Sequence, residues 1–215
     1  MTSARTRSAG RMWLALTLLA VMATGRPMRA LPGAPPVVVV VQKVANSLGL
    51  YDSATGRLIW TAAVGVRPHE LVLSAGERYA YVTDYGVGTY TDPAEGGHTV
   101  SIVDLQKGER VGVVDLGRFR RPHGIALGFS GRVYVTVDHP AAVLDMASRR
   151  EVARLAIGAA AEGLTIDTRS GFGYASAQGA NRMVKFSLTD WQPVLEIATG
   201  ASPDPMEVFQ MPVTP

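Results

Sequence analysis

The sequence contains no cysteine among its 215 residues. A disulfide framework, thiolate metal ligands, a c-type haem attachment site and a cysteine nucleophile are therefore excluded. The Gly-x-Ser-x-Gly turn of hydrolases, the phosphate-binding loop and the His-Glu-x-x-His zinc motif are also missing. No segment has the apolar spacing of an amphipathic helix. The sequence therefore points to no intrinsic redox cofactor and to no motif-defined enzyme class, and it disfavours a helical fold.

Charged residues are scarce, at 18% of the chain, while hydrophobic residues make up 47%. This composition can bury a core and is not that of a disordered chain. The formal net charge of +3 comes from the segment at 1–25, which holds three arginines and no acidic residue. Without this segment the net charge is zero. The basic isoelectric point is therefore no sign of a nucleic-acid partner.

Long apolar runs are also absent, and a short apolar run lies at the N-terminus. Arg5, Arg7 and Arg11 precede an apolar stretch at 12–23, and small residues follow at 23–25. This order is typical of an export signal, and the run is too short for a comfortable membrane span, which needs about 20 residues. We predict a signal peptide at 1–25, a proline-rich leader at 26–36 and a secreted or periplasmic protein with no stable span after cleavage. An uncleaved N-terminal membrane anchor is the alternative.

What the sequence does contain is an internal repeat. An alternating apolar run, a glycine-containing turn and a second alternating run recur at 68–83, 122–136 and 161–176, and a fourth copy starts at 203–208. Equivalent positions in these copies carry His69, His123, Glu162 and Asp204. The interval between the first two is longer than the others because the segment at 86–98 is inserted. Four short strands per repeat of about 40 residues are typical of the blades of a β-propeller.

The predicted fold is all-β, with four-stranded antiparallel blades over residues 37–209. The repeat units lie near 37–85, 86–138, 139–177 and 178–209, and 210–215 form a tail. The first unit begins partway through a blade, so the strands fill about four blades. We expect an open, partial propeller; a closed four-bladed ring is the alternative. An open arc would expose blade faces suited to burial and would therefore favour self-association.

Two stretches resemble the YVTN β-propeller repeat. They are Tyr81-Val82-Thr83-Asp84 and Tyr134-Val135-Thr136, each shortly after a Pro-His pair. The third copy departs from the pattern with Tyr174-Ala175-Ser176. The resemblance extends over about 37–208 and implies a seven-bladed propeller, usually secreted, periplasmic or surface-layer, and related to lactonase-like and quinoprotein-like propellers. It therefore implies a truncated member of that family, and it identifies the fold better than the function.

Because antiparallel strands alternate in direction, every second connection lies on the same face of a propeller. All four histidines fall in connections of one set. We therefore predict a ligand-binding face carrying Arg67, His69, Tyr85, Tyr90, His98, Arg121, His123, Asp138 and His139. Its ligand would be a protein, a glycan or a small molecule, and its arginines suit carboxylates or phosphates. Ordinary solvated loop charge is the alternative interpretation.

The four equivalent positions suggest a divalent-metal site, because His69, His123, Glu162 and Asp204 are all metal-ligand types. Packed sheets lie about 10 Å apart, however, whereas metal ligands lie about 2 Å from the ion. On this ground we expect that consecutive blades cannot share one ion, and that these residues close turns at the strand entrances. Apart from this metal, the sequence predicts no cofactor.

A catalytic interpretation remains open. A lactonase-like hydrolase would need a general base and an arginine at the channel mouth, and His123, Glu70 and Arg121 are the candidates. Their spacing is not diagnostic of this chemistry. The leading hypothesis is therefore an exported, non-catalytic propeller that acts as a binding scaffold, with the hydrolase and a metal- or anion-binding propeller as alternatives.

Overall fold

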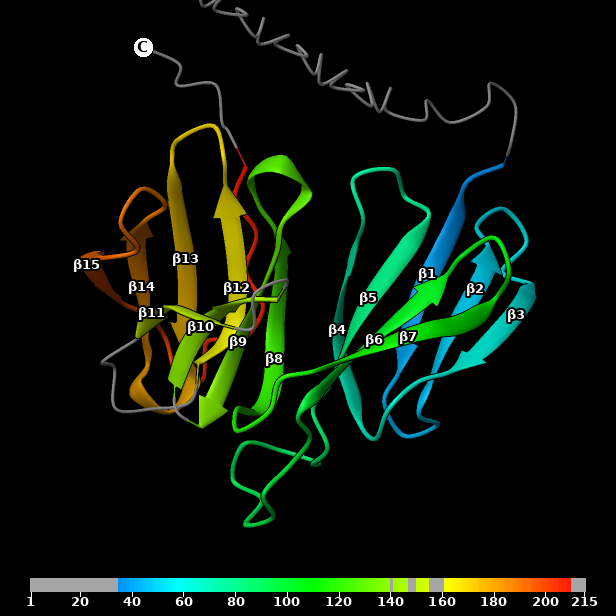
Figure 1. Ribbon diagram of the computed structural model, residues 1–215, viewed down its shortest axis with the longest axis horizontal. Coiled ribbons are helices and arrows are strands. Elements are labelled where there is room, and N and C mark those ends of the chain that lie inside the picture. Colours follow the sequence, from blue (N-terminus) through cyan, green and yellow to red (C-terminus); the bar gives the residue numbers. More distant parts are fainter. Residues whose placement is uncertain (1–34, 140, 147–149, 155–160, 210–215) are drawn as a thin grey trace, which may run out of the picture.

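The computed structural model describes residues 35–139, 141–146, 150–154 and 161–209. The predicted signal peptide, the leader up to residue 34 and the tail at 210–215 lie outside these residues. Fifteen strands and two single-turn 3-10 helices make up the described chain (Figure 1). The strands are β1 (Val37–Gln42), β2 (Ser47–Asp52), β3 (Leu58–Ala63), β4 (Pro68–Leu73), β5 (Tyr79–Asp84), β6 (Thr99–Asp104), β7 (Glu109–Asp115), β8 (Arg120–Leu127), β9 (Val133–His139), β10 (Ala141–Asp145), β11 (Arg150–Arg154), β12 (Ala161–Asp167), β13 (Phe172–Ala177), β14 (Arg182–Ser187) and β15 (Pro193–Ala198). The 3-10 turns are η1 (Phe129–Gly131) and η2 (Gln178–Ala180).

The strands form four antiparallel sheets in which each strand pairs with its neighbour in sequence. One sheet is β1-β2-β3, and the other three are β4 to β7, β8 to β11 and β12 to β15. These sheets are the blades of a propeller, so the prediction of an all-β propeller with about four blades is confirmed. The first sheet has three strands. β1 occupies the second position of its blade: Val41 pairs with Leu48 four residues before Asp52, just as Thr83 pairs with Val100 four residues before Asp104.

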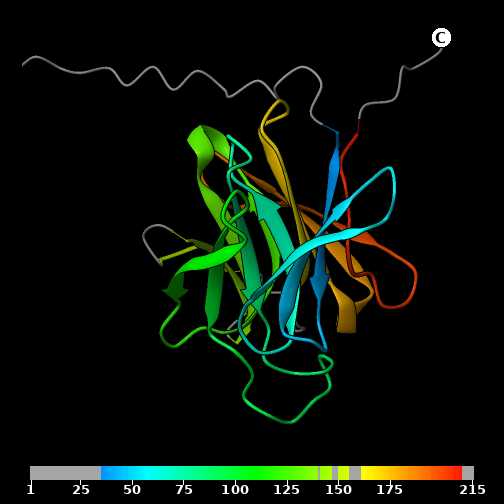
Figure 2. The ribbon, with the colours of Figure 1, turned by 90° about the vertical axis from the view of Figure 1, so that its right-hand side faces the viewer.

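The four blades form an open arc. In Figure 1, β1 (blue) lies on the right and the segment at 203–209 (red) lies on the left beside β12, while Figure 2 shows both on one side of the blades. Among the described residues, the 203–209 segment does not pair with β1, which has β2 as its only strand partner. A closed four-bladed ring is therefore not formed. β1 consequently exposes Val37, Val38 and Val40.

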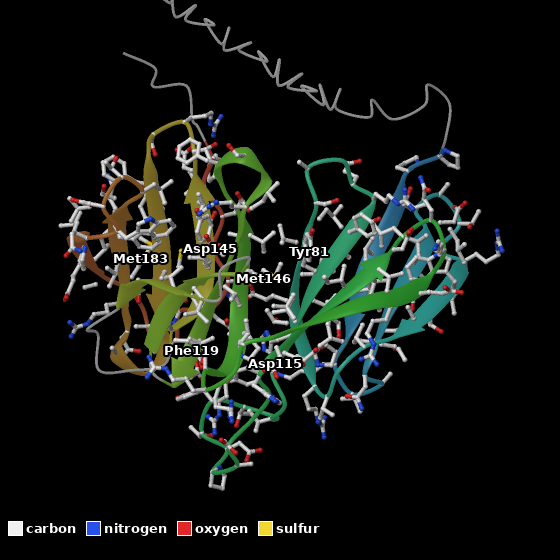
Figure 3. The ribbon with its side chains drawn as sticks, viewed as in Figure 1. Tyr81, Asp115, Phe119, Asp145, Met146 and Met183 are labelled. Carbon is white, nitrogen blue, oxygen red and sulfur yellow. The ribbon has the colours of Figure 1, made fainter. Side chains whose placement is uncertain are left out.

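The core lies between the blades, in three apolar clusters. Leu48, Val82 and Val103 belong to the cluster of the first and second blades. The cluster of the second and third blades includes Phe119 and Met146, labelled in Figure 3. The third cluster contains Phe186, Tyr134, Val143 and Ala161. Each blade thus buries the apolar face of the next, as the strand alternation predicts.

The innermost strand of each complete blade carries a β-bulge near its start. The register shifts between Pro68 and Leu71 in β4, between Pro122 and Ile125 in β8, and between Ala161 and Leu164 in β12. In each bulge two residues, 69–70, 123–124 or 162–163, oppose a single residue of the neighbouring strand, and the first of each pair is a position that the repeat alignment singled out. A bulge redirects a side chain that would otherwise follow the pleat. Here it turns one side chain of each blade toward the propeller axis.

A hydroxyl from the neighbouring strand stabilises each bulge. Thr83 Oγ1 accepts a hydrogen bond from the Glu70 amide at 2.9 Å and donates to the His123 carbonyl at 2.9 Å. Thr136 links Gly124 to Glu162 in the same way, and Ser176 links Gly163 to Asp204. One buried hydroxyl therefore joins the inner strand of its own blade to the equivalent segment of the next repeat.

Candidate functional site

The equivalent residues of successive blades meet at the axis. His123 Nε2 lies 2.5 Å from Glu162 Oε2 and 3.8 Å from Asp204 Oδ1. The rings of His69 and His123 are stacked at a tilt, with centroids 3.7 Å apart. The expectation that the spacing of blades keeps these side chains apart is therefore wrong. That spacing is the one between flat packed sheets, whereas the inner strands of a propeller converge and their bulges point the side chains inward.

A second layer of side chains comes from the ends of the second strands. Tyr85, Asp138 and Gln178 each lie two residues after the bridging hydroxyls of Thr83, Thr136 and Ser176. The Tyr85 hydroxyl donates to Asp138 Oδ2 at 3.2 Å, and its ring meets both histidine rings edge-on. Lys43 holds the same place after β1, with Nζ 5.4 Å from the centre of the Tyr85 ring.

Together these layers line a cavity of about 250 Å³ at the axis. Its walls are Lys43, His69, Tyr85, His123, Glu162, Gln178 and Asp204, with Gly88, Thr89 and Tyr90 from the inserted loop. The cavity therefore draws on every blade of the arc and on the one long insertion.

Several buried polar atoms around this cavity have no hydrogen-bond partner. They are His69 Nδ1, Glu70 Oε1, His123 Nδ1, Asp138 Oδ1, Glu162 Oε1 and Asp204 Oδ1. Buried polar atoms in folded proteins are normally hydrogen-bonded, and each exception calls for an explanation. All six atoms lie around one cavity, which makes this cavity the candidate binding site.

Burial and close charges shift the ionisation of these groups. Burial lowers the pKa of His69 to about 3, with help from the charges of His123 and Lys43. Burial also acts to lower the pKa of His123, but the carboxylates of Glu162 and Glu70 outweigh it and raise that pKa to about 10. Burial raises the pKa of Asp204, and it lowers the pKa of Lys43 against the opposing pull of Glu162 and Asp204. The site therefore favours positive charge at His123 and disfavours it at His69.

Asp138 and Tyr85 are shifted in the same sense, toward their neutral forms. Burial and the charge of Glu162 raise the pKa of Asp138 to about 7, although His123, Tyr85 and Arg121 oppose the shift. Burial, followed by the charges of Asp138 and Glu162, raises the pKa of the Tyr85 hydroxyl. Near neutral pH, Asp138 is therefore partly protonated and Tyr85 is a neutral hydrogen-bond donor.

Arg121 was predicted as a ligand-binding or catalytic residue, but its guanidinium forms hydrogen bonds with the inserted loop. It is buried and donates to the carbonyls of Tyr90, Asp92 and Ala94. Its backbone amide donates to the Gly97 carbonyl at 2.7 Å. A Cβ on Gly96 would lie 2.4 Å from Arg121 Cγ, so only glycine fits there. Arg121 therefore fixes the loop that brings Tyr90 to the cavity.

Two other residues of the predicted face, Arg67 and His98, do not line this cavity. Arg67 is exposed, and its amide donates to Asn46 Oδ1 at 2.8 Å. His98 lies in a separate hollow, with Nε2 3.9 Å from Asp115 Oδ1. The backbone of His139 pairs with Arg120 at the end of β9; its side chain lies outside the described part. The structure brings together His69, Glu70, Tyr85, Tyr90, His123, Asp138, Glu162 and Asp204, and it adds Lys43 and Gln178, which the sequence analysis missed.

No family model matches the sequence, and no curated protein matches it. Among solved structures, the chain is similar to Hydrazine Synthase of Kuenenia stuttgartiensis, with a TM-score of 0.58 and 16% sequence identity. The match covers 75% of this chain and 45% of the other, so this chain spans less than half of that protein's length. At this identity the likeness supports the propeller fold alone. No helix in the described part of the chain is long and apolar enough to cross a membrane.

Proposed function

We propose that this chain is an exported, non-catalytic binding propeller, akin to YVTN-repeat proteins, that holds a small cationic ligand in its axial cavity. The observation that carries the proposal is the set of six buried, unpartnered atoms around one cavity, described above. Five of them are carboxylate oxygens or the Nδ1 of a histidine whose other nitrogen contacts a carboxylate. The ring of His123 is the one histidine charge shared by three carboxyl groups, those of Glu70, Glu162 and Asp204, so a further cation would offset the cost of burying them.

The charges at the site favour the same class of ligand. The carboxylates of Glu70, Glu162 and Asp204 surround the histidines, whereas Lys43 is the only described lysine or arginine that lines the cavity. Arg121, another nearby cation, is engaged by loop carbonyls. The aromatic faces of Tyr85 and Tyr90 add surfaces that attract cations. An anionic ligand would meet three carboxylates, so an anion pocket is disfavoured.

The test is a thermal-shift comparison on the mature chain after treatment with a chelator. The cation set contains divalent metal chlorides, spermidine and guanidinium compounds; the other set contains citrate, phosphate and neutral sugars. A ligand at 100 times its Kd should raise Tm by about 5–10 °C. We expect a rise with at least one cation, lost in the double variant Glu162→Gln plus Asp204→Asn. A rise in Tm with the anions but not with the cations would refute the proposal, and so would a Tm that no compound changes.

A lactonase-like hydrolase is the second candidate, and the pair of His123 and Glu162 favours it. A carboxylate 2.5 Å from one imidazole nitrogen is a common way to orient a general base. Arg121, however, is not free to bind a carbonyl oxygen. A panel of lactones and esters tests this candidate: turnover that His123→Ala abolishes would support it, and no turnover on any of them would count against it.

A further inference from the structure

We propose that the cation is a divalent transition-metal ion held by His69, Glu70 and His123, with Glu162 orienting His123 from behind. The inference rests on the proposed function and names the ligand class of the same cavity. These three residues each offer one ligand atom, and the three atoms lie within 4.8 Å of one another. Two imidazoles and one carboxylate form a donor set that suits zinc and its neighbours in the first transition row.

The contact between His123 and Glu162 decides which nitrogen faces the ion. At 2.5 Å, Nε2 of His123 donates its proton to Glu162 Oε2. Nδ1 is then the nitrogen that faces Glu70 Oε1, at 3.3 Å, and both atoms are buried without a hydrogen-bond partner. A metal ion would take the place of the proton that the charged ring holds on Nδ1, because histidine binds a metal only through a deprotonated nitrogen.

The distances fit an ion on that side of the ring. Two ligands of a tetrahedral zinc ion, each about 2.0–2.1 Å from the metal, lie about 3.3 Å apart. The separation of His123 Nδ1 and Glu70 Oε1 is 3.3 Å. His69 stacks against His123, and its own Nδ1 is buried without a partner. With three protein ligands, the ion would keep a further position for water or a bound molecule, as open zinc sites do.

A second group of three, His123, Glu162 and Asp204, lies on the opposite nitrogen. Its Nε2–Glu162 distance of 2.5 Å is too short for two ligands of one ion and is that of a direct hydrogen bond. Glu162 is therefore a positioning residue. A metal-binding histidine usually donates its other N–H to such a carboxylate, which fixes the tautomer and strengthens the ligand.

Of the three complete blades in the described chain, only the first has a side chain at the position that follows the axial residue, and it is Glu70. The equivalent positions in the next two blades are Gly124 and Gly163. A Cβ on Gly124 would lie 2.3 Å from the Glu162 carbonyl, and one on Gly163 would lie 2.1 Å from the Asp204 carbonyl. The repeat therefore excludes a side chain at these positions and admits one at Glu70, beside the histidine pair.

The experiment is a titration of the chelator-stripped mature chain with Zn²⁺ by calorimetry, together with Co²⁺ absorption spectra that report the ligand geometry. We expect one ion per chain. Glu70→Gln, His69→Gln and Glu162→Gln should each weaken binding by about 10–100-fold. His98→Gln, which changes a histidine in a separate hollow, is the matched control and should leave affinity unchanged. Circular dichroism confirms that each variant is folded.

Each possible result decides the question. Absence of Zn²⁺ and Co²⁺ binding overturns the inference, and so does binding that survives both Glu70→Gln and His69→Gln or that is lost in His98→Gln. If the metals fail while spermidine or guanidinium still shifts Tm in a way that depends on Asp204, the cationic pocket stands and the metal is wrong. If no cation acts, both proposals fall. A proton shared by His123 and Glu70 then accounts for the short contact.

Discussion

The two sides of each inner-strand bulge differ in how they treat buried polar groups. On the side facing the neighbouring strand, the hydroxyls of Thr83, Thr136 and Ser176 each donate to one backbone group and accept from another. On the axial side, the side chains of the same bulges leave several atoms without partners, among them those of His123 and Glu162. The same β-bulge therefore has fully hydrogen-bonded groups on the side of the neighbouring strand and unpartnered polar atoms on the axial side.

This difference distinguishes polar groups that stabilise the fold from polar groups that are candidates for binding. A buried group that finds its partners within the chain holds the blades together, and its removal leaves other groups unsatisfied. A buried group without partners costs stability, so folding alone gives no reason for its presence. Substitutions on the two sides should consequently have opposite effects on stability.

The largest expected effect on stability is on the hydrogen-bonded side, at Thr136. Thr136→Val removes the acceptor of the Gly124 amide and the donor to the Glu162 carbonyl, and it leaves both buried. We expect a loss of about 2–4 kcal/mol in the free energy of unfolding, measured by urea denaturation at pH 7 with chelator present. Thr136→Ser keeps the hydroxyl and should lose less than half as much. Equal losses in the two variants would contradict a specific role of the hydroxyl, because Thr136→Ser retains it.

An effect of the opposite sign is expected at Asp138, which lies near the end of β9 and has an unpartnered oxygen in the same site. Its folded-state pKa of about 7 lies above the ordinary value of 3.8, because burial and Glu162 outweigh His123, Tyr85 and Arg121. The protonated acid is therefore favoured by folding; this contribution is complete below about pH 4 and is lost as the pH rises to about 7. Asp138→Asn should remove this pH dependence and, above pH 7, stabilise the chain by about 1–2 kcal/mol, allowing for the coupling to Glu162.

Urea denaturation of both proteins from pH 4 to pH 8, again with chelator, measures this change. Asp115→Asn is the control, because Asp115 is exposed and accepts from the Gly117 amide at a turn. We expect that variant to follow the wild-type pH profile. A parallel loss of stability in Asp138→Asn at every pH would show that the carboxylate is needed for packing.

The sequence was sufficient for the fold and for naming most residues of the site, but not for showing that they meet. Alternation along β5, β9 and β13 indicated strands, and the repeat spacing placed His69, His123, Glu162 and Asp204 at equivalent positions. Their convergence could not be predicted, because it depends on bulges that spacing does not reveal. The distance between flat packed sheets led to the wrong conclusion, since it ignores the taper of a blade toward the axis.

Two further residues, Arg121 and Lys43, differ from the sequence prediction because tertiary contacts decide their roles. Arg121 has the residue type of an anion ligand, and only the structure shows its bonds to loop carbonyls. Lys43 belongs to no recognisable motif, but its position could have been inferred. Asp52 and Asp104 end equivalent strands, β2 and β6, and the strand pairs then make Lys43 the equivalent of Tyr85 in the first blade.

The smallest expected effect concerns the residue that leads into the first bulge. Arg67 lies directly before Pro68 in the left-handed region, with φ of 49°, and its side chain is exposed. A non-glycine residue in this region is strained by about 1 kcal/mol. Arg67→Gly should therefore raise the free energy of unfolding by about 0.5–1 kcal/mol and leave Zn²⁺ affinity unchanged. Arg57→Gly, at an exposed position without positive φ, should lower stability instead. Weaker Zn²⁺ binding in Arg67→Gly alone would place the Arg67 side chain in the site after all, and the axial side of the bulge would then extend to the loop before it.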